Sequence, residues 1–420
     1  MTKTTPDAIA SSTIYRFRLQ DFLLGVQMLF VAFGALVLVP ILAGLNPNVA
    51  LFTSGLGTLC FQWVTGGKVP VYLASSFAFI APITLGIEKY GLAATLSGVA
   101  AAGVVYLLLS LIVFWGGSAI ITRVLPTVVT GPVIMVIGLG LAPTAVEMAT
   151  VAGASYREAT AIGVATVALL VTMLTAIVAR GFMRLIPILV GITAGYLVSL
   201  PLGLVDFTPV AQAPWLAIPS FTAPSFHLPA ILFILPVAIA PAIEHIGDVL
   251  AIGSVTGNDY LRDPGIHRTL LGDGIATTLA AFLGGPPNTT YSEVTGAVAL
   301  TRTFNPGIMT WAAIAAILLS FCGKVGAILQ TIPVPVMGGI LIVLFGTVVI
   351  VGMNSMLQTG EDLLQPRNIA IVGAILMLGV GGMSLKAGAF ALEGIGLSSI
   401  IGVLLNLLLP HAASSEEFDD

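Results

Sequence analysis

The sequence predicts an all-α polytopic membrane protein with about fourteen transmembrane segments, arranged as two inverted repeats of seven. Of its 420 residues, 57% are hydrophobic and 8% are charged, whereas soluble domains carry about 25% charged residues. Apolar stretches long enough to span a bilayer, roughly 20 residues each, follow one another with very short loops. These observations exclude a soluble enzyme.

The charged residues and the cysteines exclude further classes of protein. Fifteen basic and nineteen acidic side chains give a net charge of −4, which is too balanced for a protein that binds nucleic acid. Cys60 and Cys322 lie far apart in apolar stretches. A disulfide or a metal site is an alternative, but packed thiols fit this spacing better. We therefore expect no cofactor and no metal.

The polar segment 1–19 carries three basic residues and lacks the apolar core and cleavage site of a signal peptide, so we expect a cytoplasmic leader. Two of the apolar segments, 70–86 and 289–303, are too short and too polar to be simple spanning helices. The expected spans are 22–43, 47–65, 70–86, 91–116, 124–146, 158–179, 182–204, 228–252, 269–284, 289–303, 307–328, 334–352, 368–384 and 394–410.

The basic residues predict the orientation, because cytoplasmic loops are enriched in lysine and arginine. With both termini in the cytoplasm, eleven of the fifteen bases lie on the cytoplasmic side. The four that fall on the other side are Lys89, Arg157, Lys324 and Lys386. We therefore expect a multi-pass protein with both termini cytoplasmic.

An internal repeat divides the chain into halves. Gly66-Gly67-Lys68-Val69-Pro70 and Gly284-Gly285-Pro286-Pro287 each precede a short stretch rich in β-branched, aromatic and hydroxyl residues. A second echo links the segment that starts at Leu125 with the one that starts at Ile332. Because each half would contain an odd number of spans, the second half must be inverted relative to the first.

Inverted halves with a matched pair of short, Gly/Pro-interrupted segments are typical of secondary transporters, whose site lies where those segments meet. Extended backbone at membrane depth needs partners for its N–H and C=O groups. We expect two short antiparallel strands, one in segment 3 and one in segment 10, which pair with each other and bind a polar solute. Two ordinary kinked helices are the alternative.

Four acids lie in apolar runs of the second half: Glu244, Asp248, Asp273 and Glu293. An ionised acid at the centre of a membrane helix costs about 2.5–3.5 kcal/mol, so these acids must face a cavity, carry protons or be paired. Desolvation and like charge both favour the protonated form. Because this stretch holds no lysine or arginine at depth, Glu244, Asp248 and Asp273 are candidates for cation coupling.

Several of these residues have a second interpretation. Glu244 and Asp248 share one helix face, whereas His245 points away and is expected to pack or to form an interhelical hydrogen bond. A metal site built on these three residues is disfavoured because the other histidines lie in loops or the tail. Asp273 could cap the following helix, and Phe77 could be a packing residue.

The composition of the two short segments favours a planar solute. Backbone donors, the Glu293 carboxylate and aromatic faces such as those of Phe77 and Tyr291 suit a ring with both N–H and C=O edges, which describes a nucleobase. The sequence has no phosphate loop and no nucleophile elbow, so an ATP-driven pump or a hydrolase has no support.

At these residues the chain resembles the nucleobase–ascorbate transporter family, also called nucleobase:cation symporters of the second type, and most of all its bacterial uracil permease branch. The matching motifs are QMLFVAFGALVLVP from Gln27, SSFAFI from Ser75, EHIGD from Glu244, GDG from Gly272, GGPPNTTYSE from Gly284 and PVPVMGG from Pro333. The chain departs from the family pattern at Met28, Asp248 and Val294.

The resemblance implies a core domain of residues 1–120 and 225–328, and a gate domain of residues 121–224 and 329–420, through which two copies would form a homodimer. It implies that Glu244, Glu293, Phe77 and Ser292 hold the substrate, that Tyr291 lines the site and that Phe345 lies on the gate side. The implied function is proton-coupled uptake of a nucleobase, most of all uracil, across the inner membrane.

Three alternatives remain at this stage. One is a permease of the same family for xanthine, another purine or thymine. A second is an uncoupled uniporter or channel on the same fold, and the third is coupling to sodium in place of protons.

Overall fold

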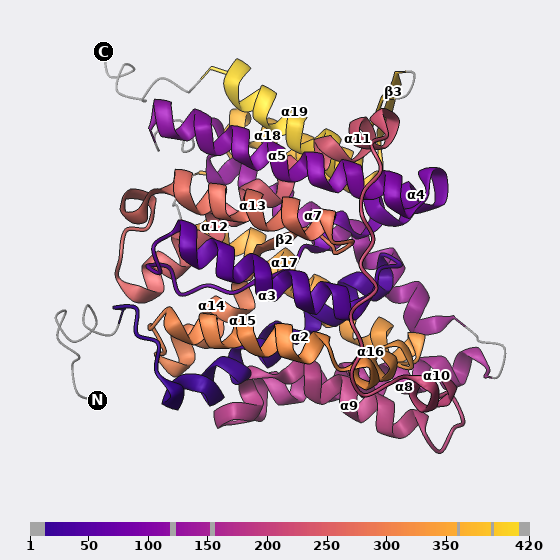
Figure 1. Ribbon diagram of the computed structural model, residues 1–420. Helices are drawn as coiled ribbons and strands as arrows, with labels where there is room; N and C mark the ends of the chain where they lie inside the picture. The colour runs from indigo at the N-terminus through magenta and orange to yellow at the C-terminus, as the bar shows by residue number, and fades with distance from the viewer. Residues whose placement is uncertain (1–12, 118–122, 152–155, 359–361, 388–389, 411–420) are drawn as a thin grey trace, which may run out of the picture.

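The structure is a computed structural model that describes residues 13–117, 123–151, 156–358, 362–387 and 390–410. Most of these residues are helical (Figure 1). The helices of the first half are α2 (Phe22–Leu42), α3 (Pro47–Val64), α4 (Ile80–Tyr90), α5 (Leu92–Gly116), α7 (Thr127–Thr150), α8 (Glu158–Val178), α9 (Pro187–Ser199) and α10 (Thr208–Gln212). Those of the second half are α11 (Leu228–Ile234), α12 (Ile239–Thr256), α13 (Ile266–Phe282), α14 (Ser292–Thr301), α15 (Gly307–Ser320), α16 (Gly323–Gln330), α17 (Val334–Gln358), α18 (Pro366–Val380) and α19 (Gly394–Leu408).

Local sequence signals determine several helix ends. The Asn46 side chain accepts hydrogen bonds from the N–H groups of Asn48 (2.8 Å) and Val49 (3.4 Å), and Pro47 occupies the first position of α3. At the other end of a helix, Gly257 follows α12 with a φ of 73°, a conformation that glycine adopts without steric cost. Short polar and Gly/Pro signals therefore divide an otherwise continuous apolar sequence.

Two short strands, one from each half of the chain, pair at the centre of the molecule. Strand β1 (Leu73–Ser75) is antiparallel to β2 (Asn288–Thr290), with Ala74 opposite Thr289. All six residues are buried. The Ser76 N–H extends the pairing by donating to the Pro287 carbonyl at 2.9 Å. The alternative of two ordinary kinked helices is therefore wrong.

Hydroxyl side chains from neighbouring helices hold the strand pair in place. Ser54 donates to the Leu73 carbonyl at 2.5 Å, and the Leu73 N–H donates to Thr58 at 3.0 Å. On the other strand, Thr277 donates to the Asn288 carbonyl at 2.7 Å. These contacts satisfy extended backbone that has no water around it, as membrane depth requires.

The helices pack into two groups. The first group contains α2–α5 and α11–α15, where α13 packs against both α3 and α5, and α15 against α2 and α3. Figure 1 shows α5, α13, α3 and α15 side by side in this order. The second group contains α7–α9 and α17–α19, where α17 packs along α7 and α8, and α18 along α19. We call these the first and second helix groups.

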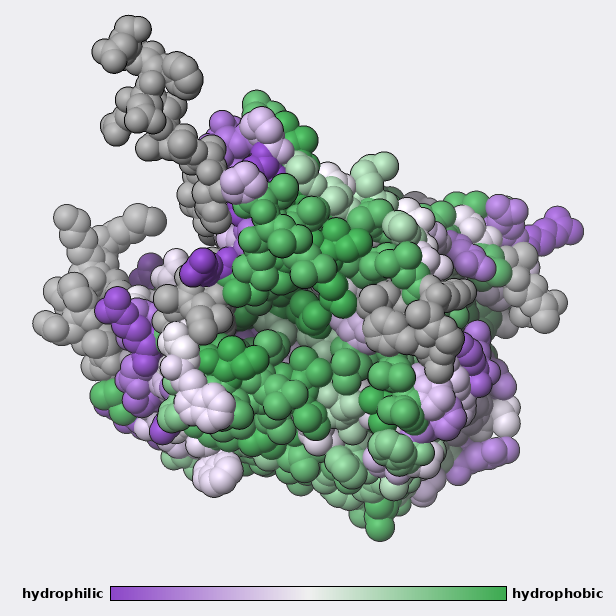
Figure 2. Space-filling view, turned by 90° about the horizontal axis from the view of Figure 1, so that it is seen from above, coloured by the Kyte–Doolittle hydropathy of each residue, from purple (hydrophilic) through white to green (hydrophobic). Residues whose placement is uncertain are grey.

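The outer surface is suited to lipid. Figure 2 shows a broad hydrophobic face with hydrophilic residues toward its two ends. Exposed large side chains on this molecule include Leu108, Phe114 and Trp115 of α5 and Leu174 and Ile177 of α8. Soluble monomers rarely expose apolar surface on this scale, so the surface is that of a membrane protein.

About fourteen segments are expected, of which 70–86 and 289–303 are not expected to be simple spanning helices; the described residues contain fewer uninterrupted spanning helices than that. Within the described part of the chain, six stretches are long and apolar enough to cross a membrane: Leu19–Leu42, Leu92–Gly116, Thr127–Thr150, Glu158–Val178, Leu228–Thr256 and Val334–Leu357. Other expected spans are shorter or interrupted. Segment 70–86 holds β1, the 3-10 turn η2 (Phe77–Phe79) and α4, while segment 307–328 divides into α15 and α16. A second antiparallel strand pair, β3 (Ser384–Ala387) with β4 (Phe390–Glu393), was not expected from the sequence.

Close helix packing predicts a clear difference between two glycine substitutions. A Cβ atom at Gly55 of α3 would lie 2.5 Å from the Ala313 carbonyl oxygen and 2.8 Å from Ile317 of α15, whereas at Gly163 of α8 it would meet nothing within 4 Å. Gly55→Leu should therefore lower the unfolding temperature in detergent, because overpacking costs about 1–3 kcal/mol or more. Gly163→Leu is the matched control and should unfold like the wild type. Equal unfolding temperatures for both variants would contradict this packing.

Candidate functional site

Two helices of the first group, α12 and α14, lie next to strand β2 and line one cavity. Helix α14 begins at Ser292, two residues after β2 ends, and α12 passes beside both elements. The cavity has a volume of about 400 Å³ and is lined by Glu244 and Asp248 of α12 and by Ser292 and Glu293 of α14. Because Glu244 and Asp248 are one helical turn apart, both carboxyl groups face the same space.

The second helix group forms the opposite wall of this cavity. Ile134 of α7 and Val348 and Asn354 of α17 line it. The cavity extends to Ser254 in the last turn of α12 and to Ser355 near the end of α17. The site therefore lies between the two groups, where a relative movement of the groups would open or close it.

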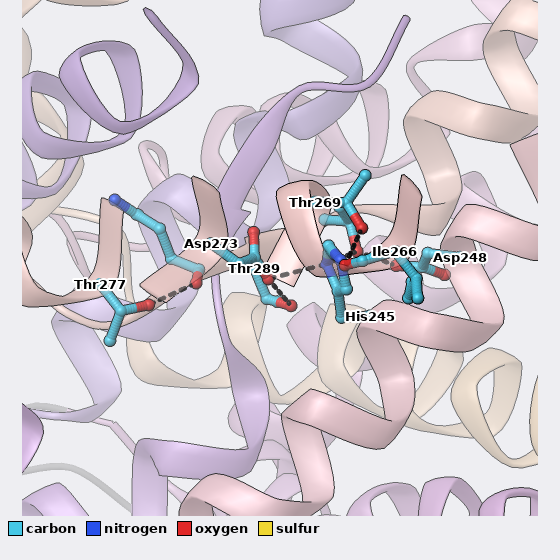
Figure 3. A network of polar contacts seen from close by, with 9 residues as sticks. His245, Asp248, Ile266, Thr269, Asp273, Thr277 and Thr289 are labelled. Atoms are coloured by element: carbon cyan, nitrogen blue, oxygen red, sulfur yellow. Dashed lines mark hydrogen bonds and ion pairs between the residues drawn. The ribbon is translucent and has the colours of Figure 1, made fainter. Parts of the chain in front are cut away.

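A buried polar network lies behind the cavity, against β2 (Figure 3). His245 Nδ1 is 2.9 Å from Asp273 Oδ2, and neither side chain has any exposed surface. Thr289 donates to the same carboxyl oxygen at 3.3 Å, and Thr290 donates to Asp248 Oδ2 at 2.9 Å. Two threonines of one strand thus connect β2 to acids on α12 and α13.

The four acids are near one another, and one of them is paired with a base. Glu244, Asp248 and Glu293 line one cavity, and the neighbouring residues Thr289 and Thr290 of β2 donate to Asp273 and Asp248. The expectation that the coupling acids have no basic partner is wrong for Asp273, because His245 pairs with it. The expected interhelical hydrogen bond of His245 is confirmed by this contact.

Asp273 does not cap a helix. It lies in the middle of α13, which begins at Ile266 after Gly265. The capping alternative is therefore wrong, and the buried carboxyl group is held by His245 and Thr289. A buried charge needs such partners, since desolvation without them is costly.

Phe77 and Tyr291 are buried and are not among the residues that line the cavity. The Phe77 ring meets the Phe345 ring of α17 edge to face, with centroids 5.9 Å apart. This contact joins the two helix groups directly. Of the five expected substrate contacts, the structure brings Glu244, Ser292 and Glu293 into one cavity.

Some polar residues of the site were not singled out from the sequence. Thr289 and Thr290 lie inside the GGPPNTTYSE motif. The sequence feature that could have identified them is a hydroxyl side chain in a strand at membrane depth. Asn354 and Ser355, near the end of the apolar helix α17, also line the cavity. An amide in an apolar run was the available signal for Asn354.

Comparison with known proteins gives the family. Residues 19–388 match the sequence profile of a permease family. The chain belongs to this family, the nucleobase–ascorbate transporters. This permease is 52% identical to a probable uracil permease of Haemophilus influenzae, over 99% of this chain and 100% of that protein. It is 45% identical to the uracil permease of Bacillus caldolyticus, over 94% and 93% of the two chains.

A solved structure shows the same fold. The transmembrane domain of the cyanobacterial bicarbonate transporter BicA superimposes with a TM-score of 0.64 at 16% identity, over 94% of this chain and 99% of that chain. This permease is accordingly a multi-pass membrane transporter with that transporter fold, and not an enzyme.

Proposed function

We propose that this permease is a proton-coupled symporter that carries uracil into the cell across the inner membrane by alternating access. The observation that carries the proposal is the cavity in which Glu244, Ser292 and Glu293 meet at the end of the strand pair. Its volume, about 400 Å³, is within the usual range for small-molecule sites, roughly 300–1,000 Å³. The uracil permeases among its relatives make uracil the proposed base.

The proposed binding mode follows from the groups that face the cavity. Uracil is a flat ring with alternating N–H and C=O groups at its edge. Carboxylates of Glu244 and Glu293 accept from ring N–H groups, and such charge-assisted bonds are among the stronger hydrogen bonds in proteins. The N–H groups of Ser292 and Glu293, the first two of α14, have no backbone partner within the described residues and could donate to ring carbonyls, whereas the third N–H of α14 donates to the Tyr291 carbonyl at 3.1 Å. Phe77 and Tyr291 do not line the cavity, so their rings would contribute aromatic surface to bound uracil only after a movement of the two helix groups.

The two helix groups correspond to the proposed core and gate domains. The first group falls within residues 1–120 and 225–328, and the second within 121–224 and 329–420. Uracil would bind to the core domain and cross when that domain moves against the gate. The pairing of one strand from each half supports two inverted seven-segment repeats. Both termini would be cytoplasmic, and the gate domain would form the homodimer contact.

Proton coupling is proposed from the buried acids. Within the described part of the chain, the one basic group paired with any of the four acids is His245. Burial and mutual repulsion both disfavour four ionised carboxylates in one place. A site with four carboxyl groups and one imidazole therefore holds protons. Since uracil binds among these groups, the affinities for proton and uracil are reciprocally linked.

Neutralising a coupling acid should separate accumulation from binding. Asp248→Asn keeps the size of the side chain and its place beside Thr290, but it can no longer release a proton. We expect uracil accumulation driven by a proton gradient to fall more than equilibrium binding or uracil–uracil exchange. Asp273→Asn should do the same. If binding and accumulation fall in parallel in both variants, these acids do not act in coupling.

A competition experiment tests the choice of base. Labelled uracil is taken up by vesicles containing the permease, with unlabelled uracil, thymine, xanthine or adenine as competitors. Uracil should compete most strongly. A stronger competition by xanthine or adenine would replace uracil with a purine as the proposed substrate.

A further inference from the structure

Glu293 borders two cavities, of which the site described above is one. A second cavity, of about 190 Å³, lies between α14, α2 and the 3-10 turn η3 (Gly181–Leu185) that leads into α9. Glu293, Gly296 and Leu300 line it from α14, Phe30 from α2 and Arg184 from η3. Glu293 is the one residue that both lining sets have in common.

The second cavity follows one face of α14. Glu293, Gly296 and Leu300 are three and four positions apart, so they lie on successive turns, and the first and last are roughly 10 Å apart along the axis. Gly296 leaves room there, because a Cβ atom at this position would meet nothing within 4 Å. A water molecule needs a cavity of about 10–15 Å³ and polar partners. This space is large enough for several water molecules, and Glu293 and Arg184 are the charged partners in a lining that is otherwise mostly apolar.

Among the described residues, two charged side chains line this cavity. Glu293 lies in the first turn of α14, and the exposed Arg184 lies on η3. Helix α2 contributes no charged side chain. The other charged groups that line a cavity with Glu293, in the part of the chain that the structure describes, are Glu244 and Asp248 of α12.

We propose that the second cavity is a water route through which Glu293 exchanges its proton with the cytoplasm, separate from the route taken by uracil. This inference rests on the proposed function. Uracil bound in the first cavity covers the carboxyl group from that side. While Glu293 is protonated, its C=O oxygen accepts from the ring N–H group. The second cavity leaves the other side accessible, so the O–H bond can break there, the proton passes to water and the carboxylate remains, with its hydrogen bond to the ring now charge-assisted. Proton release then does not have to wait for uracil to leave.

Three valine substitutions test this route, each at a glycine where an added Cβ atom would meet nothing within 4 Å. Gly296→Val narrows the second cavity and Gly247→Val narrows the first, while Gly163→Val faces outward on α8. For Gly296→Val we expect wild-type uracil binding and exchange, with a several-fold slower proton-driven accumulation. Gly247→Val should lose binding and exchange together, and Gly163→Val should match the wild type.

Labelling gives a second, independent readout. In a background of Cys60→Ala and Cys322→Ala, Gly296→Cys should react with a small water-soluble thiol reagent, at a rate that uracil does not change. Uracil should slow the reaction of Gly247→Cys. An unreactive Gly296→Cys, or equal protection of both cysteines by uracil, would overturn the separate route.

The outcomes distinguish this inference from the proposed function. If the wild-type permease fails to accumulate uracil under a proton gradient, the proposed function fails, and this inference fails with it. If the wild type accumulates uracil and Gly296→Val does so at the same rate, the inference fails alone.

Discussion

Replacing Glu293 by glutamine should weaken uracil binding by about 1.5–3 kcal/mol, which is roughly a ten- to hundredfold rise in Kd. The substitution keeps the size of the side chain but exchanges one acceptor oxygen for an NH₂ donor. The charge-assisted hydrogen bond from a ring N–H group is then lost, and the new side-chain NH₂ donor faces the ring N–H donor. Isothermal titration of the purified permease with uracil measures the change.

Two controls accompany the Glu293 variant. Glu158→Gln makes the same chemical change at an exposed acid in the first turn of α8 and should leave uracil affinity unchanged. The unfolding temperature shows whether Glu293→Gln is folded. A folded Glu293→Gln variant with wild-type affinity would remove this residue from the binding site.

Ser292→Pro should abolish uracil binding, whereas Ser292→Ala should be tolerated. Ser292 is the first residue of α14, a position where proline fits a helix. The preceding residue, Tyr291, is extended with a φ of −124° and a ψ of 110°, as a residue before proline requires. The substitution therefore removes one backbone N–H donor while the helix is retained.

The comparison between the two Ser292 variants separates backbone from side chain. Both lose the hydroxyl group, but only proline loses the N–H. We expect binding to titrate normally in Ser292→Ala and to be undetectable in Ser292→Pro, with similar unfolding temperatures. If proline binds uracil as well as alanine does, the α14 backbone does not contact the substrate.

The paired strands could be predicted from the sequence because their signals are local. A glycine pair and a proline precede each strand, and the same pattern occurs in both halves of the chain. This repeat predicted that the two short segments lie against each other. The positions of Glu244 and Asp248 on one helix face follow from their spacing alone. Their shared cavity with Glu293 could be expected only from the family resemblance.

Asp273 shows why other features could not be predicted. The flanking Gly272 and Gly274 resemble a turn before a helix, but they lie within α13. A Cβ atom at Gly272 would come within 2.7 Å of Phe61, and one at Gly274 within 2.9 Å of Tyr106. These glycines allow α13 to pack closely between α3 and α5, a tertiary reason that the local sequence does not contain.

Contacts between distant segments were equally inaccessible. The pairing of His245 with Asp273 and of Thr290 with Asp248 depends on how α12, α13 and β2 come together. The break between α15 and α16 and the second cavity beside Glu293 also depend on neighbouring elements. Spacing along the chain gives helix faces, but it does not give the partners that those faces meet.

The most direct test of the account is uracil uptake by the wild-type permease in sealed liposomes under imposed ion gradients. An inward proton gradient should concentrate labelled uracil inside above the external concentration, a proton ionophore should abolish this accumulation, and an inward sodium gradient alone should not produce it. Uracil that only equilibrates, whatever gradient of protons or sodium is imposed, would contradict proton symport and identify the permease as a uniporter.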